Sequence, residues 1–116
     1  MNNFNINVFD QMWLSGDTEE IVLNYLQADK TPIDLTGATG KMQLRKKPSD
    51  DTPALTLTAL VVAKKGQIIF TAIPTQTTAL APKARNIYFY DAEITHNGVV
   101  KTIGGGKITV HKDITR

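Results

Sequence analysis

Hydrophobic and polar side chains alternate with a period of two along most of the chain. Met42 and Leu44, for example, alternate with Gln43 and Arg45. The same period recurs at residues 4–8, 21–26, 55–58, 68–71 and 108–111. It is the period of a strand that buries one face, and the Thr, Val and Ile that fill these segments favour strands. The pattern therefore predicts an all-β protein.

Clusters of turn-forming residues separate these segments. They lie at residues 15–17, 29–32, 36–37, 48–51, 64–66 and 97–98. Short strands at such spacing are typical of sandwiches and barrels. A chain of 116 residues is long enough for one domain with its own core. We predict a single domain, residues 1–116, folded as an antiparallel immunoglobulin-like β-sandwich of about seven or eight strands.

One segment departs from the alternation. It has a proline at each end, Pro74 and Pro82, which excludes a central strand. We predict one short helical turn near residues 75–81, with Thr75 as its N-cap and Pro82 ending it. This turn would carry the chain from one sheet to the other, and Leu80 would close the end of the core.

The longest predicted strand runs from Arg85 to Thr95. One of its faces carries Tyr88, Tyr90, Ala92 and Ile94, and the other carries Ile87, Phe89, Asp91 and Glu93. The first face has no charge, so we predict that it faces the core. Buried tyrosine hydroxyls need hydrogen-bond partners, and we expect one to bond to a neighbouring loop as a tyrosine corner does.

The turn after this strand contains Asn97 and Gly98 and allows two registers. A two-residue loop, which Asn-Gly favours, places Ile94 opposite Lys101. A three-residue loop places Ile94 opposite Val100 and Glu93 opposite Lys101, which gives an apolar pair and an ion pair. Each register conflicts with the apolar–polar alternation: the first places Lys101 on the core face, and the second leaves Ile103 outside. We therefore expect a bulge near glycines 104–106.

The composition excludes several classes of partner. The net charge is +2 and the 13 Lys and Arg residues are scattered, so we expect no nucleic-acid partner. The chain has no cysteine, which excludes disulfides and thiolate metal sites. No segment has the pattern of a signal peptide or the length of a membrane span. We expect a chain made in the cytoplasm, with no membrane partner.

The residues that suggest chemistry do not form a known constellation. Lys107 follows three glycines, but the spacing and the strand after it do not match a phosphate-binding loop. His96 and His111 lack further ligands at metal-binding spacings. Asp91 and Glu93 share one strand face and are typical of the outside of a sandwich. We predict that the chain is not an enzyme and has no catalytic, cofactor-binding or metal-binding residue.

The N-terminal segment is the strongest candidate for contacts with other subunits. Trp13 is interpreted either as a core residue or as an exposed interface anchor. We predict that residues 1–13 form an extended assembly segment, able to pair with the sheet edge of another subunit. The predicted interface residues are Phe4, Phe9 and Trp13, with Arg45, Lys46 and Lys47 as a charged rim.

Two runs carry a resemblance to a known family, Asp34–Thr39 (Asp-Leu-Thr-Gly-Ala-Thr) and Tyr88–Ile94 with its Tyr-Asp-x-Glu core. With Met42–Arg45 and Gly66–Ile68 between them, the chain from Leu14 onward resembles small phage and prophage virion proteins with an immunoglobulin-like, baseplate-upper-protein-like domain. It departs from the family in Asn86, where a glycine is usual, and in its triple glycine.

The resemblance implies a non-enzymatic structural role in the virion and supplies no catalytic residue. It favours a tail, baseplate or neck adaptor that assembles as a homo-oligomer with other phage virion proteins. The alternatives are a head decoration protein, or a module that binds a host surface glycan or protein through the sandwich loops.

Overall fold

A computed structural model of the chain describes residues 7–8, 10–27 and 29–112. Within them the strands are β1 (Asn7–Val8), β2 (Gln11–Leu14), β3 (Glu19–Asn24), β4 (Thr39–Arg45), β5 (Leu55–Thr58), β6 (Leu60–Val62), β7 (Gln67–Ala72), β8 (Arg85–His96) and β9 (Val99–His111). A 3₁₀ turn, η1 (Ala63–Lys65), and a short helix, α1 (Pro74–Ala79), complete the elements.

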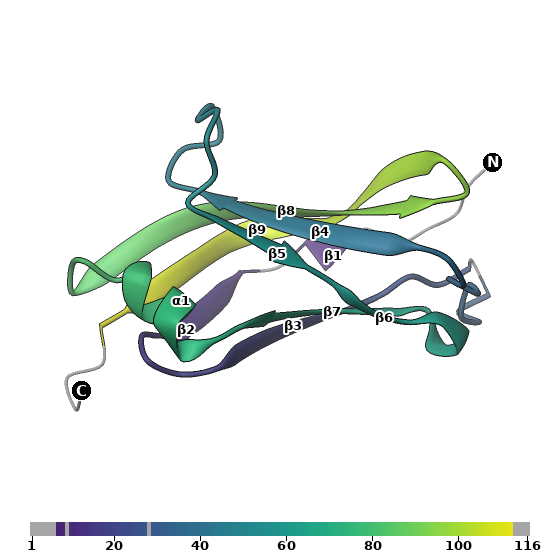
Figure 1. The fold of residues 1–116 in the computed structure, drawn as a ribbon, viewed down its shortest axis with the longest axis horizontal. Coiled ribbons are helices and arrows are strands. Elements are labelled where there is room, and N and C mark those ends of the chain that lie inside the picture. The colour runs from purple at the N-terminus through teal and green to yellow at the C-terminus, as the bar shows by residue number, and fades with distance from the viewer. Residues whose placement is uncertain (1–6, 9, 28, 113–116) are drawn as a thin grey trace.

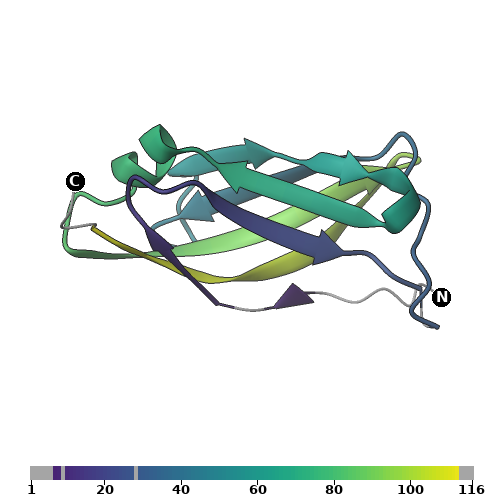
Figure 2. The same cartoon turned by 90° about the horizontal axis from the view of Figure 1, so that it is seen from below.

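The strands form two stacked sheets (Figures 1 and 2). The large sheet has the order β1-β9-β8-β4-β5, with β2 also on β9, and the small sheet has the order β3-β7-β6. A central sheet of this order, opposed by three antiparallel strands, is the arrangement of an immunoglobulin sandwich. The predicted all-β fold is confirmed. The described strands exceed the predicted number because β1 and β2 are separate pieces and because β5 and β6 lie in different sheets.

The N-terminal strands pair within their own chain. β1 lies parallel to β9 at Gly104 and Gly105, and β2 lies parallel to β9 from Ile108 to His111. The described sandwich is antiparallel as predicted except at these two pairings, which are parallel. The described part of the predicted assembly segment pairs with β9 of its own chain along one side, and its pairing with another subunit stays a prediction. Phe4 and Phe9 lie outside the described residues.

The β8 strand supplies the centre of the core as its parity predicts. Tyr88, Tyr90, Ala92 and Ile94 are all buried. The Tyr88 hydroxyl donates a hydrogen bond of 2.7 Å to the carbonyl of Leu80, which confirms the predicted tyrosine corner. The other large side chains that are fully buried are Trp13, Phe70, Ile21, Leu23, Leu35, Met42, Leu44, Ile68, Ile103, Ile108 and Val110.

The α1 helix closes one end of the sandwich (Figure 1). Its N-cap is Ile73, with Pro74 at the first helical position, so the prediction of Thr75 as the N-cap is wrong. Proline is favoured there because its missing N–H would have no helical partner. The buried Thr77 hydroxyl donates to the carbonyl of Asp17 at 2.8 Å and accepts from the N–H of Gly16 at 3.0 Å. These bonds hold the β2–β3 turn against the helix.

The β8–β9 hairpin has the two-residue loop. Asn97 and Gly98 have φ angles of 53° and 76°, as the favoured hairpin turn with two left-handed residues requires. Ile94 lies opposite Lys101, so the three-residue alternative is wrong. The register then shifts between Ala92 and Glu93, and Ile103 is the extra residue. The predicted bulge is thus present one residue before the glycines, and it returns Ile103 to the core.

The Asp34–Thr39 run forms a turn that closes the other end of the core. Asp34 accepts hydrogen bonds from the Thr36 hydroxyl at 2.6 Å and from the Thr36 N–H at 3.0 Å, and Lys64 Nζ lies 3.0 Å from its other oxygen. These bonds hold the pKa of the Asp34 carboxyl well below its usual range, and the bond from the Thr36 hydroxyl has the largest effect. Leu35 is fully buried, so the turn seals the sandwich.

Candidate binding surfaces

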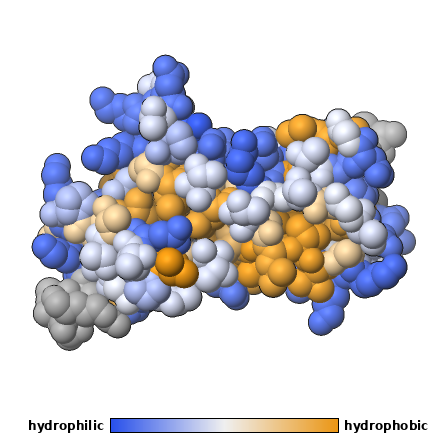
Figure 3. Space-filling model, viewed as in Figure 1, coloured by the Kyte–Doolittle hydropathy of each residue, from blue (hydrophilic) through white to orange (hydrophobic). Residues whose placement is uncertain are grey.

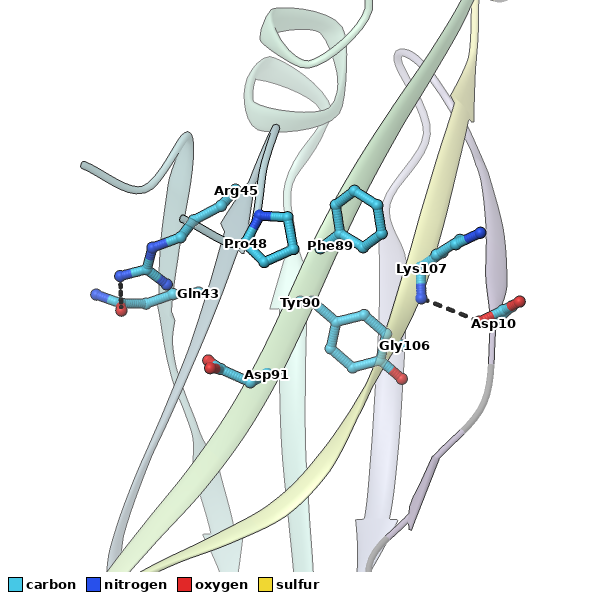
Figure 4. Close-up of a pocket in the computed structure, with 9 residues that line it drawn as sticks. All are labelled: Asp10, Gln43, Arg45, Pro48, Phe89, Tyr90, Asp91, Gly106 and Lys107. Atoms are coloured by element: carbon cyan, nitrogen blue, oxygen red, sulfur yellow. Dashed lines mark hydrogen bonds between the residues drawn. The ribbon is translucent and has the colours of Figure 1, made fainter. Parts of the chain in front are cut away.

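A groove of about 420 Å³ lies on the outer face of the large sheet (Figure 4). It runs across β4, β8 and β9 beside the loop of residues 46–54, which stands away from the sheet in Figure 1. Its lining residues combine an aromatic ring with both signs of charge, and they are Asp10, Gln43, Arg45, Pro48, Phe89, Tyr90, Asp91, Gly106 and Lys107.

Arg45 fixes the position of this loop. Its Nε donates to the carbonyl of Asp50 at 2.9 Å, and its Nη2 donates to Gln43 Oε1 at 2.8 Å. Lys46 and Lys47 follow it in the loop and are exposed. The structure therefore brings the three predicted rim residues together, but the guanidinium of Arg45 is used within the chain. Its side chain orders the loop that presents the two lysines.

Phe89 forms the apolar part of the groove. Its ring is half-buried, and Lys107 Nζ lies 5.8 Å from the ring centre, within the range of a cation–π contact. The N–H of Lys107 donates to Asp10 Oδ1 at 3.0 Å, which holds the residue before β2 against β9. Burial, with the charge of Asp10, raises the pKa of Tyr90 to about 12.

The paired carboxylates of β8 belong to the same face. Asp91 is exposed, and Glu93 lies 3.5 Å from the ammonium of Lys41 on β4. The three-residue alternative would have placed Lys101 opposite Glu93, but the two-residue loop places Thr102 there. Within the described residues no group of three His, Asp or Glu side chains is placed to hold a metal ion. The groove offers contacts for a bound molecule: one ring, an amide and separated charges.

Trp13 lies in the core, with only 1% of its surface exposed. This agrees with the core interpretation and leaves no surface for a partner to contact. Its position follows from β2, whose pairing with β9 turns Trp13 inward and leaves its neighbour Met12 65% exposed.

A second surface, which the sequence analysis missed, lies on the outside of the small sheet. Val22, Ile69 and Leu60 are register neighbours on β3, β7 and β6, and we call them the apolar row. Val22 is 40% exposed, Leu60 is 65% exposed and Ile69 is half-buried. Figure 3, which looks at the side of the sandwich, shows apolar surface gathered around β6 at the edge of the small sheet. The signal in the sequence was an apolar residue at both parities, as at Ile68 and Ile69.

Comparisons with known proteins add little to these surfaces. No family model and no curated protein matches the chain. Among solved structures it is similar to the N-terminal domain of phage TP901-1 ORF48, with 12% identity over 94% of this chain and 97% of that one and a TM-score of 0.45. It is also similar to the NK cell receptor Nkp44, with 11% identity over 94% and 99% and a TM-score of 0.46.

A third similar structure is murine CRIg, with 13% identity, 97% of each chain covered and a TM-score of 0.39. TM-scores this low carry no argument about function, and the fold assignment rests on the strand order. None of the helices in the described residues is long and apolar enough to span a membrane.

Proposed function

We propose that this protein is a non-enzymatic structural component of a phage particle, a tail, baseplate or neck adaptor that acts by binding other virion proteins. The observation that carries the proposal is the apolar row across the outer face of the small sheet. The family resemblance of the Asp34–Thr39 and Tyr88–Ile94 runs supports the phage setting.

The apolar row is suited to a protein partner. A solvated sheet face normally alternates with polar residues, whereas Val22, Ile69 and Leu60 expose apolar surface on three adjacent strands. Contiguous apolar surface of this kind marks interaction sites. Covering Leu60 alone, which is 65% exposed, would contribute about 1–2 kcal/mol to association.

The loop of residues 46–54 provides a charged rim at a separate place. Arg45 and Asp50 hold it in one conformation, because Asp50 also accepts a hydrogen bond from the N–H of Lys47 at 3.2 Å. A loop that is ordered before binding loses less conformational entropy when a partner contacts Lys46 and Lys47. The two surfaces together fit an adaptor with more than one neighbour.

Incorporation into particles tests this function. Mass spectrometry of purified phage particles from cells that express the chain should detect it at a fixed ratio to other virion proteins. Leu60→Asp should lower that ratio several-fold, because a carboxylate would be buried against the partner. Val100→Asp is the matched control, since Val100 is 57% exposed on β9 and belongs to neither the apolar row nor the loop of residues 46–54. Particles without the wild-type chain would contradict the proposal.

A further inference from the structure

β3 is an edge strand whose outer side no described strand covers. In an immunoglobulin sandwich the first strand commonly pairs with the second, at this edge. Here β1 and β2 both pair with β9 of the large sheet, so β3 pairs with β7 alone. Figure 2 shows β2 leaving the line of β3 and running beside β9.

The register shows which backbone groups face outward. The N–H of Tyr25 donates to the carbonyl of Gly66 at 2.8 Å, just beyond the pair Asn24–Gln67. Hydrogen-bonded and non-bonded pairs alternate along an antiparallel ladder, so Leu23 and Ile21 bond to β7. The backbone groups of Glu20 and Val22 therefore point away from the sheet. No other residue of the described chain forms a hydrogen bond with them.

We propose that a second copy of this chain pairs with β3 in the antiparallel direction, about a two-fold axis at Val22. Val22 then lies opposite Val22 of the second copy and exchanges backbone hydrogen bonds with it, and Glu20 lies opposite Asn24. A parallel arrangement would instead place Glu19 and Glu20 beside the same acids of the other copy, which is destabilising. The charges thus select the antiparallel pairing.

The side chains at this edge fit the same occupant. The apolar row of each copy ends at Val22, so the pairing joins two rows into one that runs from Leu60 to Leu60 across both small sheets. β3 has neither the proline nor the lysine that commonly protects an edge. The β6 edge is shorter and is followed by Lys64 and Lys65 of η1.

This dimer deepens the proposed function, because it supplies the self-assembly unit of an adaptor. Different results would contradict the dimer and the virion role. A chain that is present in particles yet monomeric in solution would overturn the dimer alone. A dimer that is absent from particles would overturn only the virion role.

Charged substitutions of Val22, at the two-fold axis, test the dimer most directly. Sedimentation velocity and light scattering of the wild-type chain should show a monomer–dimer equilibrium that shifts with concentration. Val22→Lys and Val22→Glu should each weaken dimerisation about tenfold or more, because like charges then meet at the axis. An equimolar mixture of the two variants should restore the dimer as a heterodimer. Thr71→Lys and Thr71→Glu, exposed on the same face but on the central β7, are the matched controls.

Three outcomes would overturn the pairing: a wild-type chain that stays monomeric at its highest soluble concentration, Val22 variants that dimerise as the wild type does, or a mixture that stays monomeric. Circular dichroism confirms that each variant folds. Cross-linking gives a second measurement, since the chain has no cysteine. Val22→Cys should form a disulfide-linked dimer under mild oxidation, because opposed Cα atoms lie about 5.5 Å apart. Thr71→Cys should remain monomeric.

Discussion

The outer faces of the two sheets differ in their side chains: one carries polar groups that pair with each other, and the other carries exposed apolar groups. On the large sheet, charged and amide groups pair across strands, as Lys41 does with Glu93 and Gln43 with Thr56. On the small sheet, the apolar row crosses all three strands, and its two ends, Val22 and Leu60, are exposed. The first face is suited to water, and the second is suited to another protein.

This difference teaches where to look for function in a sandwich. Phe89 and the paired acids of β8 attract attention in the sequence because they combine an aromatic ring with carboxylates. In the structure Phe89 and Asp91 line the groove, and Glu93 pairs with Lys41 outside it. The small sheet carries few residues of chemical interest, yet it leaves apolar surface and an edge exposed.

The largest predicted effect tests whether both faces rest on one shared core. Tyr90→Ala should destabilise the fold by about 3–5 kcal/mol, as for other large aromatic side chains removed from a core. Tyr90 is only 4% exposed. Urea unfolding measures the change. Phe89→Ala, the adjacent residue on the outer face, should cost much less. A loss below about 1 kcal/mol at Tyr90 would place it outside the core.

An effect of intermediate size is the loss of stability at alkaline pH caused by the titration of Tyr90, a core residue that also lines the groove. Burial and the charge of Asp10 raise its pKa from 10.0 to about 12. The folded state therefore favours the neutral phenol of Tyr90. Its contribution to the free energy of unfolding is fully present below pH 10.0 and is lost as the pH rises from 10.0 to about 12. Tyr90→Phe should flatten the decline of stability in that range. Unfolding midpoints measured at a series of pH values, with phenolate absorbance, check this slope.

Tyr88→Phe is the control for that titration. Burial also raises the pKa of Tyr88, but this hydroxyl donates to Leu80. Removing it should lower stability below pH 10.0 by about 1 kcal/mol, the usual net value of a hydrogen bond, and should flatten the alkaline decline less than Tyr90→Phe does. If Tyr90→Phe declines with pH as steeply as the wild type, Tyr90 does not carry the alkaline sensitivity.

The sequence predicted the features that depend on local pattern. The parity of β8, the helical turn between Pro74 and Pro82, and the Asn97–Gly98 hairpin all follow from side-chain period and turn chemistry. The pairing of β2 with β9 did not follow, because it joins segments about a hundred residues apart in the chain. The sequence predicted Trp13 both as core and as anchor for the same reason.

Buried polar residues were a second kind of miss. Thr77 lies in a segment rich in threonine, and only the fold shows that its hydroxyl bonds to the β2–β3 turn. Asn86, where the resembling family has glycine, donates to the carbonyl of Val110 at 3.0 Å and so joins β8 to β9. The apolar row was missed because apolar residues at both parities, as at Ile68 and Ile69, do not show which face of the strand is buried.

The smallest predicted effect concerns the ion pair of the large face. Lys41 and Glu93 are 3.5 Å apart, and their side chains are 51% and 39% exposed. Water and salt screen such a pair, so Glu93→Gln should change the free energy of unfolding by less than about 0.5 kcal/mol. A double-mutant cycle with Lys41→Met, repeated at high salt, isolates the coupling. A coupling well above 1 kcal/mol would mean that this face stabilises the fold through its charges. The two faces would then differ in what they contribute to the stability of the fold, as well as in how much apolar surface they expose to water.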